Sequence, residues 1–136
     1  MIDDTARYKD LRVLVIEDEA FARRIISGLL RQIGFNHIDD AVDGEKGFRE
    51  TERHRPQLVL CDVHMPIDGL WYLAKLRGSS NRQIADTPVI FLTADKQQET
   101  VLSAKELQVD GYLVKPVSLQ TLRQRVDSVL KANGFL

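Results

Sequence analysis

Residues 58–69 read LVLCDVHMPIDG, an apolar run that stops at a carboxylate, Asp62, and is soon followed by a proline. The first four residues are all apolar, which is typical of a strand buried on both faces in a parallel sheet. Pro66 cannot continue such a strand. A buried carboxylate needs partners, and open α/β sheets bind their ligands at the carboxyl ends of strands. Asp62 is therefore either a solvated loop residue or the reacting group of a site.

The chain as a whole has the composition of an ordinary globular domain. It has 136 residues, of which 43% are hydrophobic and 29% charged, a size and composition that suit one domain. Its 19 Lys and Arg against 20 Asp and Glu disfavour direct nucleic-acid binding. No apolar run approaches the ~18 residues of a membrane span, and the N-terminus does not resemble a secretory leader. The single cysteine suits the reducing cytoplasm.

Strand and helix patterns alternate five times along the chain. We expect a domain over 11–132, with a polar, irregular tail over 1–10 and a short C-terminal tail over 133–136. The expected strands cover 11–16, 37–42, 58–61, 89–92 and 112–114. The expected helices cover 21–33, begin at 43–44 and near 69, span about 97–107, and follow the N-cap residue at 118. This alternation predicts a doubly wound α/β fold, a parallel sheet with helices on both faces.

Four of the predicted strands end in polar residues. These are Glu17 and Asp18, then Asp62, Thr93 and Lys115. Because parallel strands end at one edge of the sheet, we expect these side chains to converge there. Three close carboxylates repel one another unless a cation compensates them, and carboxylates suit Mg²⁺ or Mn²⁺. Such a metal beside a nucleophilic carboxylate, an ammonium and a hydroxyl indicates phosphoryl transfer.

Taken together, these motifs resemble the receiver domain of the response regulators of bacterial two-component signalling. The resemblance covers about residues 11–130 and rests on the acid pair at 17–18, Asp62 with MP at 65–66 and DG at 68–69, TA at 93–94, and YLVKP at 112–116. It implies a flavodoxin-like sheet with strand order 2-1-3-4-5 and five helices. It also implies a phosphorylation-dependent signalling module that is not a conventional enzyme.

The resemblance implies a role for each acid of the predicted site. Asp62 would accept a phosphoryl group from a sensor histidine kinase or a histidine phosphotransfer protein. Mg²⁺, or alternatively Mn²⁺, would be held by Glu17, Asp18, Asp62 and the backbone carbonyl of His64.

Further roles follow from the same resemblance. Lys115 would pair with the phosphoryl group, Thr93 would move to hydrogen-bond it, and Tyr112 would turn inward as an aromatic switch. His64 and Asp95 stand where the family tunes the lifetime of the phosphate. The switched surface would comprise the helix over 97–107, the strand over 112–114 and the last helix. A downstream effector would bind there, and the chain would be a monomer or a weak dimer on phosphorylation.

The chain departs from the family pattern in two places. Only Ile67 separates Pro66 from Asp68, where the family usually has two residues, so the loop beside Asp62 is expected to be short. Gln108 and Val109 replace a small Gly-Ala pair before the last strand and are expected to alter the packing of the preceding helix.

Two other functional classes use a similar arrangement. A phosphatase with an aspartate nucleophile has a second acid two residues later as its general acid, whereas this chain has His64 at that position. A flavodoxin-like cofactor binder needs a hydroxyl- or glycine-rich loop after the first strand, whereas residues 17–19 are EDE. Both patterns fit this sequence less well than the receiver pattern does.

Overall fold

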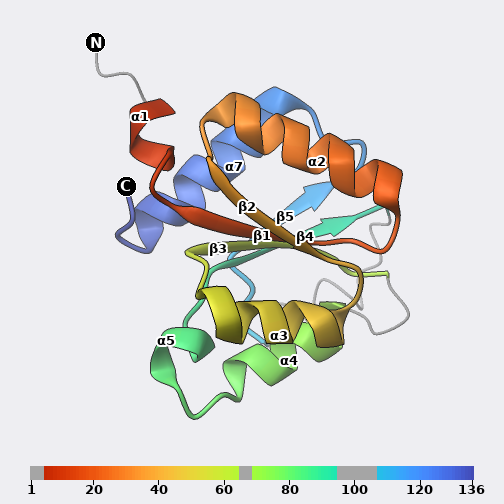
Figure 1. Ribbon diagram of the computed structural model, residues 1–136, viewed down its shortest axis with the longest axis vertical. Helices are drawn as coiled ribbons and strands as arrows, with labels where there is room; N and C mark the ends of the chain where they lie inside the picture. The colour runs from red at the N-terminus through yellow and green to blue at the C-terminus, as the bar shows by residue number, and fades with distance from the viewer. Residues whose placement is uncertain (1–4, 65–68, 95–106) are drawn as a thin grey trace.

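A computed structural model describes residues 5–64, 69–94 and 107–136 (Figure 1). The elements, in chain order, are α1 (Thr5–Tyr8), β1 (Arg12–Ile16), α2 (Ala20–Ile33), β2 (His37–Ala41), α3 (Gly44–His54), β3 (Leu58–Asp62), α4 (Gly69–Arg77), α5 (Arg82–Ala85), β4 (Val89–Thr93), β5 (Gly111–Val114) and α7 (Leu119–Ala132).

The five strands form one parallel sheet in the order β2-β1-β3-β4-β5. This confirms the predicted fold class and strand order. The register pairs Ile16 with Cys61 and Asp62 with Leu92, so the carboxyl ends of the three central strands lie level with one another. Every residue of β3 and β4 is buried, as the continuous apolar runs predicted.

The helices cover both faces of the sheet, with α2 and α7 on one side and α3 and α4 on the other (Figure 1). Successive residues of a strand point to opposite faces of the sheet, so the strands contribute to two hydrophobic cores, one on each face. Val13 and Val15 of β1 pack with Leu30 of α2 on the first face. Leu14 and Ile16 pack with α4 on the second. The central strands are therefore held from both sides, which gives the residues at their ends a rigid support.

The N-terminal residues differ from the predicted irregular tail. Residues Thr5–Tyr8 form a short helix, and the Tyr8 ring is fully buried 5.2 Å from the ring of Phe35. The Tyr8 hydroxyl donates a hydrogen bond to Asp127 of α7. The prediction is wrong for this segment because one aromatic side chain docks an otherwise polar stretch onto the core.

One other difference concerns a helix. The short helix α5 lies in a segment for which no helix was predicted, and Asn81 caps it by accepting hydrogen bonds from Gln83 and Ile84. The helix predicted over 97–107 falls almost entirely outside the described residues.

Gly47 in the middle of α3 faces β1 so closely that a side chain does not fit. A Cβ atom built on it would lie 2.4 Å from Cδ1 and 2.9 Å from Cγ1 of the fully buried Ile16. We expect Gly47→Ala to lower the free energy of unfolding by about 1 kcal/mol, since overpacking outweighs the gain in helix propensity. Gly28 of α2 has nothing within 4 Å of such a Cβ, so Gly28→Ala should raise stability by about 0.5–1 kcal/mol. Urea unfolding of both variants measures the difference, and equal stabilisation would contradict the close packing.

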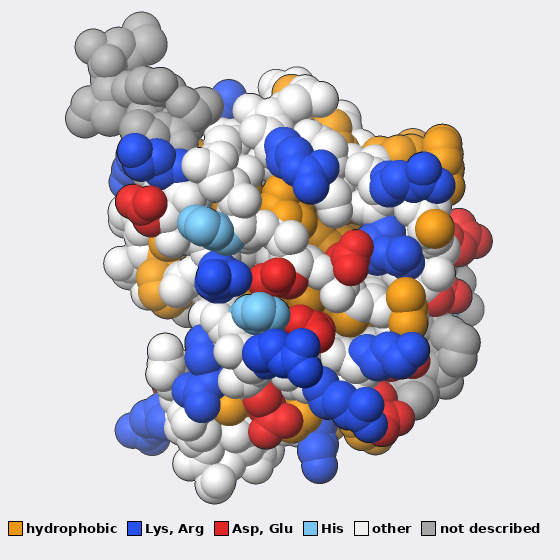
Figure 2. Space-filling view, in the orientation of Figure 1, with side chains coloured by type: hydrophobic (Ala, Val, Ile, Leu, Met, Phe, Trp, Pro, Cys, Tyr) orange, Lys and Arg blue, Asp and Glu red, His pale blue; other side chains and the backbone are white. Residues whose placement is uncertain are grey.

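The surface agrees with a nearly neutral chain. Basic and acidic side chains are interspersed over the face that carries β2 and α3, and they form no stripe of one sign (Figure 2). Within the described residues, no helix has the length and apolarity that crossing a bilayer requires.

Candidate functional site

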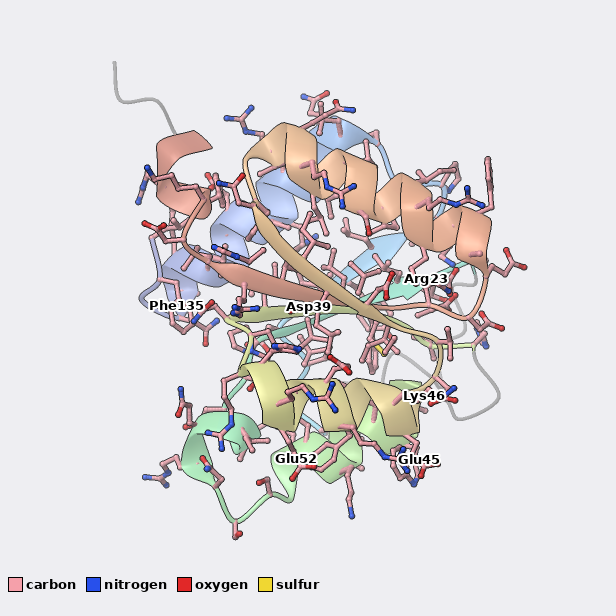
Figure 3. All side chains as sticks on the ribbon, in the orientation of Figure 1. Arg23, Asp39, Glu45, Lys46, Glu52 and Phe135 are labelled. Atoms are coloured by element: carbon pink, nitrogen blue, oxygen red, sulfur yellow. The ribbon has the colours of Figure 1, made fainter. Side chains whose placement is uncertain are left out.

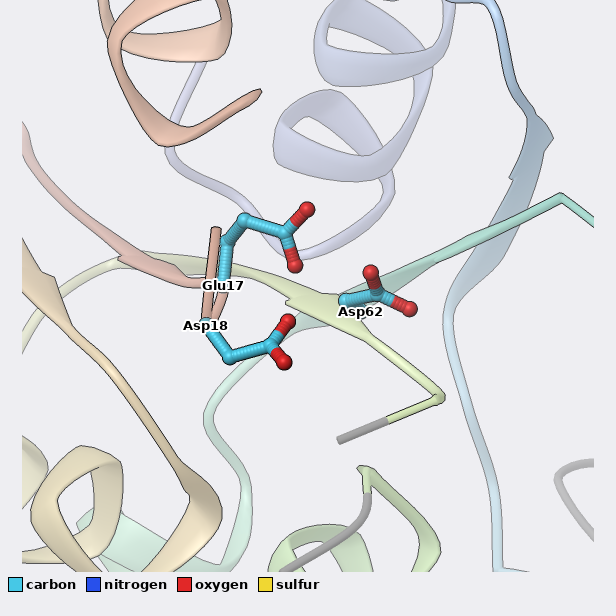
Figure 4. A group of neighbouring side chains, drawn as sticks. All are labelled: Glu17, Asp18 and Asp62. Carbon is cyan, nitrogen blue, oxygen red and sulfur yellow. The ribbon is translucent and has the colours of Figure 1, made fainter. Parts of the chain in front are cut away.

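The carboxyl ends of β1 and β3 bring three acidic side chains together (Figure 4). Carboxylate oxygens of Glu17, Asp18 and Asp62 all lie within 4.8 Å of one another. Glu17 and Asp62 are buried, whereas Asp18 is exposed, so the cluster is open to solvent on one side. The convergence predicted from the strand ends is present in the structure.

Lys115 supplies the compensating charge inside this cluster. Its Nζ donates hydrogen bonds to Asp62 Oδ2 at 2.7 Å and to Glu17 Oε1 at 2.9 Å. The backbone N–H of His64 donates to the other oxygen of Asp62 at 2.8 Å. Glu17 Oε2 is buried and has no hydrogen-bond partner among the described residues. One ammonium therefore bonds to two acids but compensates only one negative charge, and it leaves a buried oxygen of Glu17 available to a further cation.

These contacts shift the pKa values of the two buried acids in opposite directions. Burial, reinforced by the neighbouring Asp62, raises the pKa of Glu17 to about 7. Burial also acts to raise the pKa of Asp62, but its contact with Glu17 and the hydrogen bonds from Lys115 and the His64 N–H outweigh burial and lower this pKa. Burial acts to lower the pKa of Lys115, and its bonds to the two carboxylates raise it overall. Asp62 is thus the acid of the pair that ionises more readily, and the ionised form is the one in which a carboxylate can act as a nucleophile.

The raised pKa of Glu17 makes the stability of the metal-free protein depend on pH. Between the ordinary value of 4.5 and about 7, the folded protein binds more protons at this residue than the unfolded chain does. The stabilisation is therefore complete below pH 4.5 and is lost as the pH rises through 7. We expect urea unfolding in EDTA to show this decline, and Glu17→Gln to lack it. Identical pH profiles for the two proteins would contradict the shift.

Thr93 and Tyr112 lie on the strands next to the cluster. Thr93 ends β4 and is buried, and its carbonyl accepts a hydrogen bond from the backbone N–H of Lys115 at 2.8 Å. The Tyr112 ring stands edge-on to that of Phe91, with 6.0 Å between centroids. Its hydroxyl oxygen is buried and has no hydrogen-bond partner among the described residues. Both residues lie where the strand pattern placed them, and the tyrosine ring points into the protein.

Some predicted features fall outside the described residues. These include Asp95 and the shortened loop around Ile67. The second departure from the family pattern is visible, because Gln108 adopts a left-handed backbone with φ of 60°. Its carbonyl accepts a hydrogen bond at 2.8 Å from Arg77 at the end of α4.

Sequence reasoning assigned no supporting role to two residues that hold the site. Gly69 begins α4 so close to β3 that a Cβ atom would lie 2.8 Å from the carbonyl oxygen of Asp62. Arg23 of α2 donates a hydrogen bond to the carbonyl oxygen of Glu17. A basic residue in the first turns of a helix is electrostatically unfavourable, and this was the one available signal for Arg23.

A doubly wound sheet with a lysine and three carboxylates at one edge defines a phosphoryl-transfer site of the receiver type. Comparison with known proteins agrees, because the model of the response regulator receiver domain matches residues 13–127. The chain belongs to this family of phosphorylation-dependent signalling modules, and the match favours it over the phosphatase and flavodoxin-like alternatives.

Individual relatives are similar over nearly the whole chain. Chemotaxis protein CheY-3 of Vibrio cholerae is 30% identical over 124 residues, which are 90% of this chain and 94% of the relative. The probable transcriptional regulator ycf27 of Porphyridium aerugineum is 40% identical over 88% of this chain and 48% of its own length. The structure of Vibrio cholerae CheY4 covers 88% of this chain and 98% of its own, with 27% identity and a TM-score of 0.81.

Proposed function

We propose that Asp62 is the phosphoacceptor of this receiver and that the surrounding residues hold its metal and its phosphoryl group. The observation that carries the proposal is the position of the Asp62 carboxylate. It is ionised, hydrogen-bonded to Lys115 at 2.7 Å, and within 4.8 Å of two further carboxylates at the open edge of the sheet.

The donor set fits a small divalent cation. Three carboxylates offer only oxygen ligands, which Mg²⁺ prefers and Mn²⁺ accepts. The buried oxygen of Glu17 has no hydrogen-bond partner among the described residues, so it is available as a ligand for a cation. Glu17, Asp18, Asp62 and the carbonyl oxygen of His64 would hold the ion. When bound, it would offset negative charge on the phosphoryl oxygens.

The chemical step needs a nucleophile and charge compensation. A carboxylate oxygen of Asp62 attacks the phosphorus of a phosphohistidine on the donor, and the bond from phosphorus to the imidazole nitrogen breaks. The imidazole leaves with that electron pair, and Asp62 becomes an acyl phosphate. Lys115 already touches the nucleophile and would follow the transferred group as its charge develops.

Phosphorylation would change the conformation of the protein through Thr93 and Tyr112. Thr93 would hydrogen-bond the phosphoryl group, and Tyr112 would act as the aromatic switch, while His64 and Asp95 would tune the lifetime of the phosphate. The switched surface would be the helix over 97–107 with β5 and α7, which an effector protein would bind.

The donor would be a sensor histidine kinase or a histidine phosphotransfer protein. In this proposal the chain acts in the cytoplasm as a monomer or a weak dimer on phosphorylation. It catalyses only its own phosphorylation and dephosphorylation.

The direct test supplies acetyl phosphate as a small donor. With Mg²⁺ present, we expect intact-mass spectrometry to show one phosphoryl group per chain, and EDTA should prevent the addition. A chain that stays unmodified at saturating donor and Mg²⁺ would rule out the proposed function. Release of phosphate from p-nitrophenyl phosphate at many turnovers per chain would instead indicate a phosphatase.

A further inference from the structure

Arg23 connects α2 to the strand ends that carry the acidic cluster. It lies between α2 and the ends of β1 and β2 (Figure 3). Its Nη1 donates to the carbonyl oxygen of Glu17 at 2.9 Å, and its Nε donates to Asp40 Oδ2 at 3.3 Å. The Arg23 side chain is only 18% exposed, whereas that of Asp40 is 60% exposed. The guanidinium is thus largely buried. Its two hydrogen bonds link α2 to the carboxyl ends of β1 and β2.

The carbonyl that Arg23 binds belongs to the peptide group between two of the three acids. A peptide group is planar, so holding the oxygen of Glu17 also fixes the direction in which the chain leaves toward Asp18. The N–H of Glu17 is held as well, because it donates to the carbonyl oxygen of Ala41 at 3.0 Å. The backbone of Glu17 is therefore anchored on both sides, once by the edge strand and once by Arg23.

The position of Arg23 is unfavourable for the helix itself. α2 begins at Ala20, and its N-cap residue Glu19 makes no side-chain capping bond. A cation near a helix N-terminus opposes the helix dipole. The charge-assisted hydrogen bonds to the Glu17 carbonyl and to Asp40 offset this cost. The neighbouring Arg24 of the same helix is exposed. The contact with the Glu17 carbonyl therefore depends on the position of Arg23 in the helix and not on its positive charge alone.

We propose that Arg23 is a positioning residue that sets Glu17 and Asp18 in the geometry required for divalent-cation binding. This inference rests on the proposed function, because it assumes that the acidic cluster binds a metal. Arg23 does not touch the metal in this scheme. It acts through the backbone of Glu17, as partners outside the ligand sphere do in other metal sites.

Charge and geometry predict opposite effects for the same substitution. If Arg23 acted only through its charge, Arg23→Gln would remove a cation near the acids and Mg²⁺ would bind more tightly. If Arg23 holds the peptide group, Arg23→Gln should weaken Mg²⁺ binding, by about tenfold or more. The sign of the change in affinity therefore separates the two explanations.

The experiment titrates the full chain with MgCl₂ by isothermal calorimetry. Arg23→Gln should bind Mg²⁺ about tenfold more weakly than the unchanged protein, while Arg24→Gln, with the same change in charge, should bind it as tightly or slightly more tightly. Arg23→Lys keeps the charge but not the planar fork that reaches two oxygens, so most of the loss should remain. Circular dichroism establishes that each variant is folded. If Arg23→Gln does not fold, the Mg²⁺ affinity of Arg23→Lys provides the test.

A second measurement distinguishes positioning from general damage. With acetyl phosphate, the Mg²⁺ concentration that gives half the maximal phosphorylation rate should rise about tenfold in Arg23→Gln, with little change in the rate at saturating Mg²⁺. Unchanged or tighter Mg²⁺ binding in Arg23→Gln, full recovery in Arg23→Lys, or a lower rate at saturating Mg²⁺ would overturn the inference alone. Failure of the unchanged protein to bind Mg²⁺ or accept phosphate would overturn the proposed function and this inference with it.

Discussion

Replacing Asp62 with asparagine is expected to abolish phosphorylation by acetyl phosphate. Asparagine has nearly the same shape, and its single amide oxygen can accept from one of the two donors, Lys115 or the His64 N–H, which bind different oxygens of Asp62 at 2.7 and 2.8 Å. It has no carboxylate oxygen to attack phosphorus, so the loss should be complete. Intact-mass spectrometry after incubation with Mg²⁺ and donor measures the result. Asp86→Asn, at an exposed acid away from the carboxyl ends of the strands, is the matched control and should be phosphorylated normally.

The same substitution should also change the electrostatics of the cluster. Asp62 contributes to the raised pKa of Glu17, so Asp62→Asn should bring the pKa of Glu17 back toward 4.5. Mg²⁺ affinity should fall because one of three carboxylates is gone. Labelling of Asp62→Asn at the rate of the control would contradict the phosphoacceptor assignment, since another residue would then carry the phosphate.

Most strands of the fold were predictable because they are apolar runs with a clear stop, whereas β2, with the sequence HIDDA, gave a weaker signal. The predicted and observed boundaries of β3 and β4 differ by one residue, and in both cases the polar end residue belongs to the strand. The buried parallel strands produced the strongest sequence signal because both faces must be apolar. The helix α1 gave no such signal. Its anchoring depends on the contact of Tyr8 with Asp127, 119 residues away, which no local pattern records.

The main residues of the site were predictable for a topological reason. Polar residues that follow buried parallel strands must meet at one edge, so Glu17, Asp62 and Lys115 could be grouped before any coordinates were known. The way in which they share hydrogen bonds could not be predicted. Lys115 reaches Glu17 as well as Asp62, and Arg23 holds a backbone carbonyl, because side-chain lengths and strand twist decide these contacts.

Replacing Lys115 with methionine is expected to impair both stability and phosphoryl transfer. The ammonium bonds to two carboxylates that are 2% and 9% exposed, and methionine would leave both acids without that partner. Removing one member of a buried ion pair costs about 3–5 kcal/mol. Because the Lys115 side chain is 25% exposed, solvent screening reduces the expected loss to about 1–3 kcal/mol without metal. The pKa of Asp62 should rise as well, since the ammonium helps to lower it.

Divalent cations should offset this loss only in part. Mg²⁺ can neutralise the acids, so adding it should stabilise Lys115→Met more than it stabilises the unchanged protein, as urea unfolding with MgCl₂ or EDTA would show. The metal cannot replace the ammonium beside the phosphoryl group, and the phosphorylation rate at saturating Mg²⁺ should remain about a hundredfold lower. Lys46→Met, at an exposed lysine of α3, should change neither property. Full recovery of the rate by Mg²⁺ would mean that Lys115 only balances the charge of the acids and takes no part in the transfer.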